Sequence, residues 1–259
     1  MSSGRENINS RVEENVAIVS LNRPERLNAM DTETMKGLYE IVDQMAKRTD
    51  VSSIILTGEG RAFSSGSDAK EYLTMTLYDY INHQIIGNRL YQLIEEVDKP
   101  VIAAVNGYAL GGGFELALAC DLIVASKNAR FGFPEIRIGL SPGGGFRKLL
   151  GNVGPYKLKE LLWTGEFLTA EELYRAGVIN RVVEPENLLD EAKALANSVV
   201  GAWVAVKNVK RVINETMARI FSHRDSTEAF LTSLLFNTED GKEGLKAFIE
   251  KRSPRMKGR

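Results

Sequence analysis

Residues 99–117, Lys99-Pro-Val-Ile-Ala-Ala-Val-Asn-Gly-Tyr-Ala-Leu-Gly-Gly-Gly-Phe-Glu-Leu-Ala117, join an apolar run to a glycine-rich turn and a short helical pattern. The run at 101–105 is apolar on both faces, which is typical of a buried strand in a parallel sheet. The glycines at 111–113 allow a ligand to approach the backbone closely. The helix expected at 114–120 begins there, and its unpaired amides and dipole favour negative charge. The stretch therefore predicts an α/β fold with an anion-stabilising turn.

Strand and helix patterns alternate on the N-terminal side of this stretch. The β-branched run at 16–21 predicts a strand, and the apolar run at 51–57 predicts another. Between them, Asp31 can cap a helix whose apolar side chains recur at helical spacing, namely Met35, Leu38, Val42 and Met45. A strand–helix–strand unit of this length forms a right-handed crossover between parallel strands.

The remaining patterns divide the chain into two regions. Helix is expected over 69–95, with Gly87 as the weakest point of the pattern. Two more strands are expected, at 122–125 and 178–183. We therefore predict an α/β core over residues 1–195, followed by a mostly helical region over 196–259.

The C-terminal region carries apolar side chains at helical spacing. They are Trp203, Val206, Val209, Ile213, Met217 and Phe221, followed by Phe230, Leu234, Leu235, Leu245, Phe248 and Ile249. These faces can pack against one another. Because terminal helices cannot all cover the same sheet, we expect part of this surface to contact a second subunit and the protein to form homo-oligomers.

The composition excludes several classes of protein. With 44% hydrophobic residues, 26% charged residues and a formal net charge of -1, the chain is neither disordered nor suited to broad nucleic-acid or anionic-membrane binding. The single Cys120 excludes a disulfide framework, and with His83 and His223 far apart in sequence we expect no metal site. The polar N-terminus and the interrupted apolar stretches predict no signal peptide, no membrane association and a cytoplasmic location.

Two short motifs resemble known sites but do not fit their chemistry. Residues 139–143 match the GxSxG turn of serine hydrolases, yet Pro142 follows Ser141 and has no N–H to donate to an oxyanion. The glycines at 111–113 are not followed by a Walker lysine, and Leu116 stands where a dinucleotide-binding turn needs glycine.

Two carboxylates and a second glycine loop remain as candidate chemistry. Glu115 lies in the first turn of the helix after the glycines, and Glu135 follows Pro134 in an apolar run. A carboxylate among apolar neighbours is costly unless it is paired or its pKa is raised, as a general acid requires. The loop at 60–68 leaves a strand and enters a helix, so it can present another backbone N–H. Such amides and carboxylates together suit stabilisation of an enolate during proton transfer.

The sequence resembles the crotonase (enoyl-CoA hydratase/isomerase) superfamily. The matching stretches are collinear over nearly the whole chain, and the 99–117 block is highly specific. They are 23–29, 62–68, 99–117, 131–136 and 247–252. The resemblance implies a crotonase-like spiral of ββα units with a helical C-terminal oligomerisation region, assembled as trimers or dimers of trimers.

The same resemblance assigns roles to individual residues. It places an oxyanion hole for the thioester oxygen of an acyl-CoA at the N–H groups of Ser67 and Gly112. Glu115 and Glu135 would hold one water, with Glu115 assisting attack at Cβ and Glu135 delivering a proton to Cα. The expected substrate-binding residues are Arg26, Leu27 and Ala29 along the CoA nucleotide, Ser65, Asp68 and Ala69 around the adenine pocket and thioester, Gly143 near the water, and Phe248 and Lys251 in a terminal helix that can reach a neighbour's CoA.

The function implied by two carboxylates is reversible syn hydration of a trans-2-enoyl-CoA to a 3-hydroxyacyl-CoA. It needs no metal or redox cofactor, and coenzyme A arrives as part of the substrate. The alternatives are enoyl-CoA isomerisation, dehydration of a specialised hydroxyacyl-CoA, thioester hydrolysis, or non-catalytic CoA or RNA binding. Ser65 and Ser67 stand where many members of the superfamily carry alanine, and residues 146–148 interrupt a common hydratase pattern, so the acyl group stays open.

Overall fold

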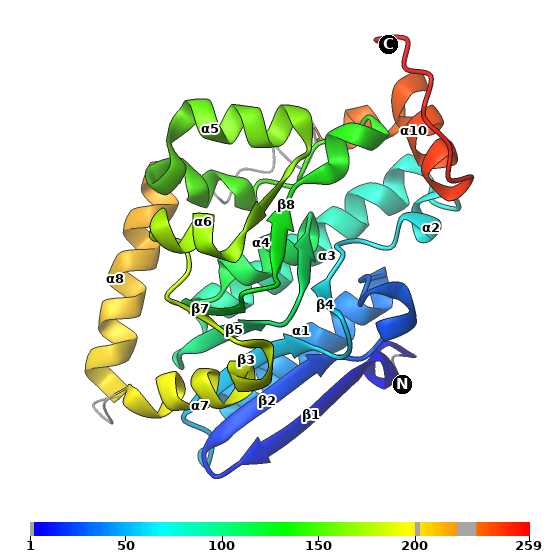
Figure 1. The fold of residues 1–259 in the computed structure, drawn as a ribbon. Coiled ribbons are helices and arrows are strands. Elements are labelled where there is room, and N and C mark those ends of the chain that lie inside the picture. The colour runs from blue at the N-terminus through cyan, green and yellow to red at the C-terminus, as the bar shows by residue number, and fades with distance from the viewer. Residues whose placement is uncertain (1–2, 200–202, 222–231) are drawn as a thin grey trace.

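The computed structural model describes residues 3–199, 203–221 and 232–259, which form two β-sheets surrounded by helices (Figure 1). The larger sheet has the strand order β1-β2-β3-β5-β7-β10. Its strands are β1 (Ile8–Glu13), β2 (Val16–Leu21), β3 (Ser53–Gly58), β5 (Val101–Val105), β7 (Leu122–Ser126) and β10 (Arg181–Val183). Only the β1–β2 pair is antiparallel within this described sheet. The predicted parallel pairing of the strands at 16–21 and 51–57 is confirmed.

A second, four-stranded sheet has the order β4-β6-β8-β9. Its strands are β4 (Ala62–Ser64), β6 (Tyr108–Leu110), β8 (Arg130–Gly132) and β9 (Phe167–Thr169). Successive strands β3 and β4, β5 and β6, and β7 and β8 alternate between the two sheets, which confirms the spiral of ββα units. Sequence patterns do not single out these strands because three residues are too few to show a period.

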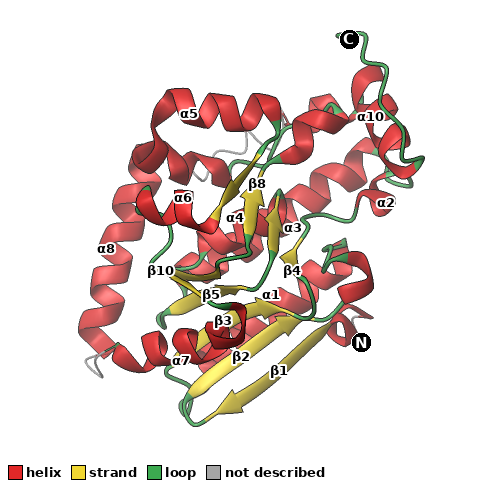
Figure 2. Ribbon diagram, in the orientation of Figure 1, coloured by secondary structure: helices red, strands yellow, loops and turns green. Residues whose placement is uncertain are grey.

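Helices pack on both faces of the larger sheet and around the smaller one (Figure 2). The α-helices are α1 (Thr32–Lys47), α2 (Ala69–Tyr72), α3 (Leu77–Glu96), α4 (Gly112–Ala119), α5 (Leu150–Thr164), α6 (Ala170–Arg175), α7 (Leu188–Ser198), α8 (Trp203–Phe221) and α10 (Glu239–Ile249). The 3-10 helices are η1 (Ser3–Asn7), η2 (Pro24–Arg26), η3 (Pro134–Ile138), η4 (Gly145–Leu149) and η5 (Pro185–Asn187).

The two faces of the larger sheet bury different residues because side chains alternate along each strand. On one face, Ala17 and Val19 pack with the apolar side of α1, whose predicted Asp31 cap accepts a hydrogen bond from the Thr34 amide at 2.8 Å. On the other face, Ile18 packs with Leu188 and other side chains of α7. The sheet is therefore covered on both sides, as its apolar strands predict.

Helix bounds differ from the predictions in two places. The helix expected over 69–95 breaks at residues 73–76, where Thr76 caps α3 with Asp79 in a reciprocal capping box, and Gly87 lies inside the continuous α3. Helix α4 begins at Gly112, two residues earlier than expected, because the glycine turn itself enters the helix.

The strand predicted over 178–183 is shortened to β10. The amides of Val178 and Ile179 donate to the Leu173 carbonyl at the end of α6, so they are not available to the sheet. Val178 and Ile179 favour a strand by their side chains, but their amides bind the end of α6. These hydrogen bonds therefore override the strand propensity.

The C-terminal region is helical, as predicted, in α8 and α10. On α8 the side chains of Val209 and Ile213 are exposed. The predicted positions Trp203, Phe221 and Phe230 lie outside the residues whose side chains are described. The boundary predicted at 195–196 falls inside α7, and the division into two regions and the subunit contact stay predictions.

Among the described residues, no helix combines the length and apolar character needed to span a bilayer.

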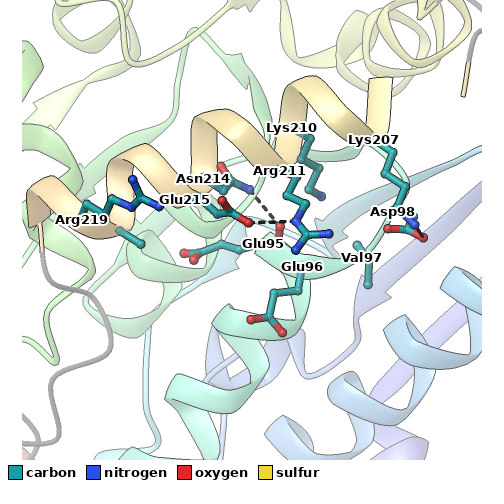
Figure 3. A pocket seen from close by; sticks show the side chains of 11 residues that line it. Glu95, Glu96, Val97, Asp98, Lys207, Lys210, Arg211, Asn214, Glu215 and Arg219 are labelled. Atoms are coloured by element: carbon teal, nitrogen blue, oxygen red, sulfur yellow. Dashed lines mark hydrogen bonds and ion pairs between the residues drawn. The ribbon is translucent and has the colours of Figure 1, made fainter. Parts of the chain in front are cut away.

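Helix α8 lies against the end of α3, where the buried Lys210 lines a charged pocket of about 710 Å³ and Asn214 donates to the Glu95 carbonyl at 2.9 Å (Figure 3). Lys210 Nζ, with 8% of its side chain exposed, lies 2.8 Å from Asp121 Oδ2 and donates to the carbonyls of Ile94 and Lys99 at 3.0 Å. Burial raises the pKa of Asp121 despite the opposing effect of Lys210. The pocket is lined by Glu95, Glu96, Val97, Asp98, Lys207, Lys210, Arg211, Asn214, Glu215, Ala218 and Arg219.

Replacing Lys210 by methionine should lower the free energy of unfolding by about 3 kcal/mol. This is the lower end for a broken buried ion pair, because Asp121 keeps its hydrogen bond from the Val101 amide. Urea denaturation measures the change. Lys207 on the same helix pairs with the exposed Asp98, so Lys207→Met is the matched control and should change stability by less than about 1 kcal/mol. Equal losses in both variants would contradict the prediction.

Candidate active site

Glu115 and Glu135 are brought together from two different turns of the spiral. Glu115 lies in the first turn of α4 and is buried, and its Oε1 accepts a hydrogen bond from the Gly145 amide at 2.7 Å. Glu135 lies in η3, directly after Pro134. The charge of Glu115 contributes to the shifted pKa of Glu135, so the two carboxyl groups are electrostatic neighbours. The two carboxyl groups predicted to act together therefore lie in the same region of the structure.

The Glu135 carboxyl group has an unusual environment for an acid. The residue retains some exposed surface, but its Oε2 is buried and has no hydrogen-bond partner among the residues that the structure describes. Burial, reinforced by the charge of Glu115, raises the pKa of Glu135 to about 8. At neutral pH this carboxyl group therefore carries a proton, as the sequence argument for a general acid requires. Two neighbouring carboxyl groups with different environments are an arrangement that divides acid and base roles.

The raised pKa of Glu135 predicts that the free energy of unfolding falls as the pH rises. Native Glu135 keeps its proton up to about pH 8, whereas the ordinary value is 4.5, so between these values the native state binds more protons than the unfolded state. Wild-type protein should lose stability between about pH 5 and 8 relative to Glu135→Gln, which has no such proton. Urea denaturation across this range measures the difference, and a difference independent of pH would contradict the prediction.

The Ser67 and Gly112 amides lie on backbone segments that touch. A Cβ built on Gly112 would lie 3.8 Å from the Ser67 nitrogen, and a Cβ built on Gly66 would lie 3.2 Å from the Gly112 nitrogen. Gly112 begins α4, so its N–H has no acceptor within the helix. Among the described residues the Ser67 amide has no hydrogen-bond acceptor. Within the described residues, these two amides therefore lie on adjacent backbone segments without an acceptor, as an oxyanion hole would require.

Glycines make this close approach possible. Gly111 has a φ of +51°, and a Cβ there would lie 2.5 Å from Glu135 Oε1. A Cβ on Gly113 would lie 2.3 Å from the Ser64 carbonyl oxygen, which belongs to the strand leading into the Ser67 loop. The glycine turn therefore places α4 against both the Ser67 loop and Glu135.

The residues expected along the CoA nucleotide come together where the segment between β2 and α1 meets the segment between β4 and α2. The Ser65 amide donates to the Leu27 carbonyl at 2.9 Å, and the Ala29 carbonyl accepts from the Arg23 guanidinium at 2.6 Å. Arg26 Nη1 lies 2.8 Å from Asp68 Oδ2. Burial opposes the ionised form of Asp68, but hydrogen bonds from Arg26 and the Lys70 amide, with the Arg23 charge, lower its pKa overall. Asp68 also caps α2, whose first residue is Ala69.

The other predicted substrate residues divide into one near the carboxylates and two at the surface. A Cβ on Gly143 would lie 3.4 Å from Glu115 Oε2, so Gly143 is beside the Glu115 carboxylate. Phe248 is 57% exposed near the end of α10, and Lys251 follows that helix with a φ of +53°. Helix α10 packs on η3, where a Cβ on Gly244 would lie 2.2 Å from the Ile138 carbonyl oxygen. The structure does not bring Phe248 or Lys251 to the carboxylates.

Three residues of the site were not predicted from the sequence. Gly145 binds Glu115 through its amide, Tyr91 donates from its hydroxyl to the Gly112 carbonyl at 2.9 Å, and His83 contacts Ser67. The glycine run at 143–145 could have indicated a close backbone approach at Gly145. Tyr91 and His83 occupy ordinary helical core positions in the sequence, so nothing marks them as site residues. Across the described residues, no group of three or more His, Cys, Asp and Glu side chains is arranged to hold a metal ion.

Comparison with known proteins places these features in a family. A family model described as enoyl-CoA hydratase/isomerase matches residues 11–259. A short-chain-enoyl-CoA hydratase of Clostridium acetobutylicum is 42% identical over 92% of this chain and 92% of its own length. A crotonyl-CoA hydratase of Syntrophomonas wolfei is 40% identical over 95% and 96%.

Solved structures agree with the sequence comparison. An enoyl-CoA hydratase from Mycobacterium avium subsp. paratuberculosis has a TM-score of 0.84 at 28% identity, covering 97% of this chain and 98% of its own. A methylmalonyl-CoA decarboxylase has a TM-score of 0.85 at 25% identity, covering 98% and 99%. The same fold thus supports more than one reaction, so the reaction has to be argued from the site.

Proposed function

Because the chain belongs to the enoyl-CoA hydratase/isomerase family, we propose that it catalyses reversible syn addition of water to a trans-2-enoyl-CoA, giving a 3-hydroxyacyl-CoA. The observation that carries this proposal is the pair of carboxyl groups, Glu115 and a Glu135 whose buried Oε2 has no hydrogen-bond partner in the described part of the chain. The pair lies beside the Ser67 and Gly112 amides. The carboxyl groups can therefore bind the water and transfer the proton while the amides bind the carbonyl oxygen.

In the proposed mechanism the thioester carbonyl oxygen accepts hydrogen bonds from the Ser67 and Gly112 amides. Attack of water at Cβ turns this oxygen into an enolate oxygen, and the amides and the α4 dipole stabilise its developing charge. Glu115 takes a proton from the attacking water, and the protonated Glu135 delivers a proton to Cα. Coenzyme A enters as part of the substrate, and no other cofactor takes part.

We propose short-chain enoyl-CoA thioesters as the substrates, with crotonyl-CoA as the first to test. The names of the two bacterial relatives support this choice. Hydration removes the conjugated double bond, so the absorbance of the enoyl thioester should fall on mixing with the enzyme. The product should be a 3-hydroxyacyl-CoA by mass. If absorbance does not change with crotonyl-CoA or with longer enoyl-CoAs, the hydratase assignment is wrong.

We also propose that the chain forms homo-oligomers, such as trimers or dimers of trimers, and acts in the cytoplasm. Exposed apolar side chains on α8, including Val209 and Ile213, support a subunit contact. The single buried Cys120 fits a reducing compartment. Light scattering during size-exclusion chromatography measures the assembly, and a monomer at micromolar concentration would contradict it.

A further inference from the structure

The hydroxyl of Ser67 faces a histidine that the hydration mechanism does not use. Ser67 Oγ lies 3.2 Å from Nε2 of His83, which comes from α3 and is 2% exposed. Ser67 itself is partly exposed. A Cβ on Gly112 would lie 3.6 Å from this Oγ, so the hydroxyl sits beside the two free amides. A serine oxygen, a histidine and an oxyanion-binding pair of amides therefore share one place.

The other nitrogen of His83 has an acidic partner. His83 Nδ1 lies 2.9 Å from Thr32 Oγ1 and 3.5 Å from Glu71 Oε2, which also accepts the Thr32 amide at 3.0 Å. Burial opposes the ionised form of Glu71, but hydrogen bonds from His83 and Thr32 lower its pKa overall. An ionised Glu71 beside Nδ1 favours the tautomer with its proton on Nδ1. The lone pair of Nε2 then faces the Ser67 hydroxyl.

We propose that Ser67 is the nucleophile of a second activity, the hydrolysis of acyl-CoA thioesters, with His83 as its general base. Glu71 and Thr32 act as positioning residues for the imidazole. The proposal rests on the proposed function, because it needs an acyl-CoA carbonyl bound by the Ser67 and Gly112 amides. A nucleophilic serine whose own amide belongs to the oxyanion hole is a geometry that serine hydrolases use.

The reaction balances in two steps. Ser67 Oγ attacks the thioester carbon and passes its proton to His83 Nε2, so an oxygen–carbon bond forms. The carbon–sulfur bond breaks, and His83 returns the proton to the leaving coenzyme A thiolate. In the second step His83 deprotonates a water, which attacks the acyl-serine ester and releases a carboxylic acid. Ser67 recovers its proton, and no oxidant or reductant takes part.

The acyl chain decides which activity the site performs. Hydration needs a double bond next to the carbonyl, whereas attack by Ser67 needs only the carbonyl. Saturated acyl-CoA thioesters can therefore be hydrolysed but not hydrated.

The Tyr72 hydroxyl lies 3.3 Å from His83 Nε2 and competes with Ser67 for the same lone pair. Tyr72→Phe removes this competitor and keeps the ring that packs against His83.

The test uses the full-length protein with butyryl-CoA, and released thiol is measured with a chromogenic disulfide reagent. Wild-type protein should release coenzyme A faster than buffer alone. Ser67→Ala and His83→Gln should reduce this rate to that of buffer, and Tyr72→Phe should retain or increase it. Acid quenching soon after mixing should yield a butyryl adduct on the peptide that contains Ser67. Crotonyl-CoA hydration is followed in the same samples, and Glu184→Gln, which alters a surface ion pair outside the site, should keep the wild-type rates of both reactions.

Two sets of results would overturn the proposal. Wild-type protein that hydrates crotonyl-CoA but releases no coenzyme A from butyryl-CoA would remove this activity and leave the hydratase assignment intact. Hydrolysis that survives Ser67→Ala but is lost in Glu135→Gln would assign the reaction to water and the carboxylates. The adduct on wild-type protein does not depend on any variant folding. Wild-type protein that releases coenzyme A from butyryl-CoA but does not hydrate crotonyl-CoA would instead count against the proposed function.

Discussion

Replacing Glu135 by glutamine should lower the rate of crotonyl-CoA hydration by about 10²- to 10⁴-fold, the usual contribution of a positioned general acid. Burial and the charge of Glu115 raise the pKa of Glu135 to about 8, so the wild-type side chain carries the proton that Cα needs. Glutamine has a similar shape but no acidic proton. The measurement is the initial fall in enoyl-thioester absorbance at saturating substrate, compared with wild type.

The control for this prediction is a glutamate with no part in the site. Glu184 pairs with Lys127 at the surface, so Glu184→Gln should hydrate crotonyl-CoA at the wild-type rate. Glu115→Gln tests the reaction type, because hydration needs both carboxyl groups and isomerisation can proceed with one. Loss of activity in both site variants supports hydration. An active Glu115→Gln enzyme that isomerises double bonds would contradict it.

Replacing Gly113 by alanine should lower hydration by at least about 10²-fold, because a misplacement near 1 Å has effects of that size. The new Cβ would lie 2.3 Å from the Ser64 carbonyl oxygen, and both atoms belong to, or are attached to, rigid backbone. The α4 start and the Ser67 loop would have to separate, which would move the Ser67 and Gly112 amides of the proposed oxyanion hole apart. Both kcat and the affinity for substrate should fall.

A matched glycine replacement separates this effect from a general loss of stability. Among the described residues, a Cβ on Gly87 inside α3 would meet only Met35 Sδ, at 3.4 Å, which is ordinary contact. Gly87→Ala should therefore keep wild-type activity and, by helix propensity, be at least as stable. Thermal unfolding of both variants shows whether Gly113→Ala is folded under assay conditions. A folded Gly113→Ala enzyme with wild-type activity would contradict the role given to this contact.

The motif-bearing segments were predictable from the sequence because each carries its own local signal. Strand 101–105 is apolar on both faces, the glycines precede a helix, and Asp31 caps α1 as expected. The short strands of the second sheet were not predictable, since their pairing is set by neighbours far apart in the chain. The break between α2 and α3 was also missed, because Thr76 and Asp79 form its capping box in a stretch that reads as helix throughout.

By itself, the amino-acid order determined the α/β class, the glycine turn before α4 and the presence of acids at 115 and 135, because turns, caps and buried strands depend on neighbouring residues. Only the tertiary structure decided that Glu135 Oε2 is buried near Glu115, that the Gly112 turn packs against the Ser67 loop, and that His83 contacts the Ser67 hydroxyl. Burial, electrostatic coupling and the convergence of amides depend on segments separated along the chain, and packing alone brings those segments together.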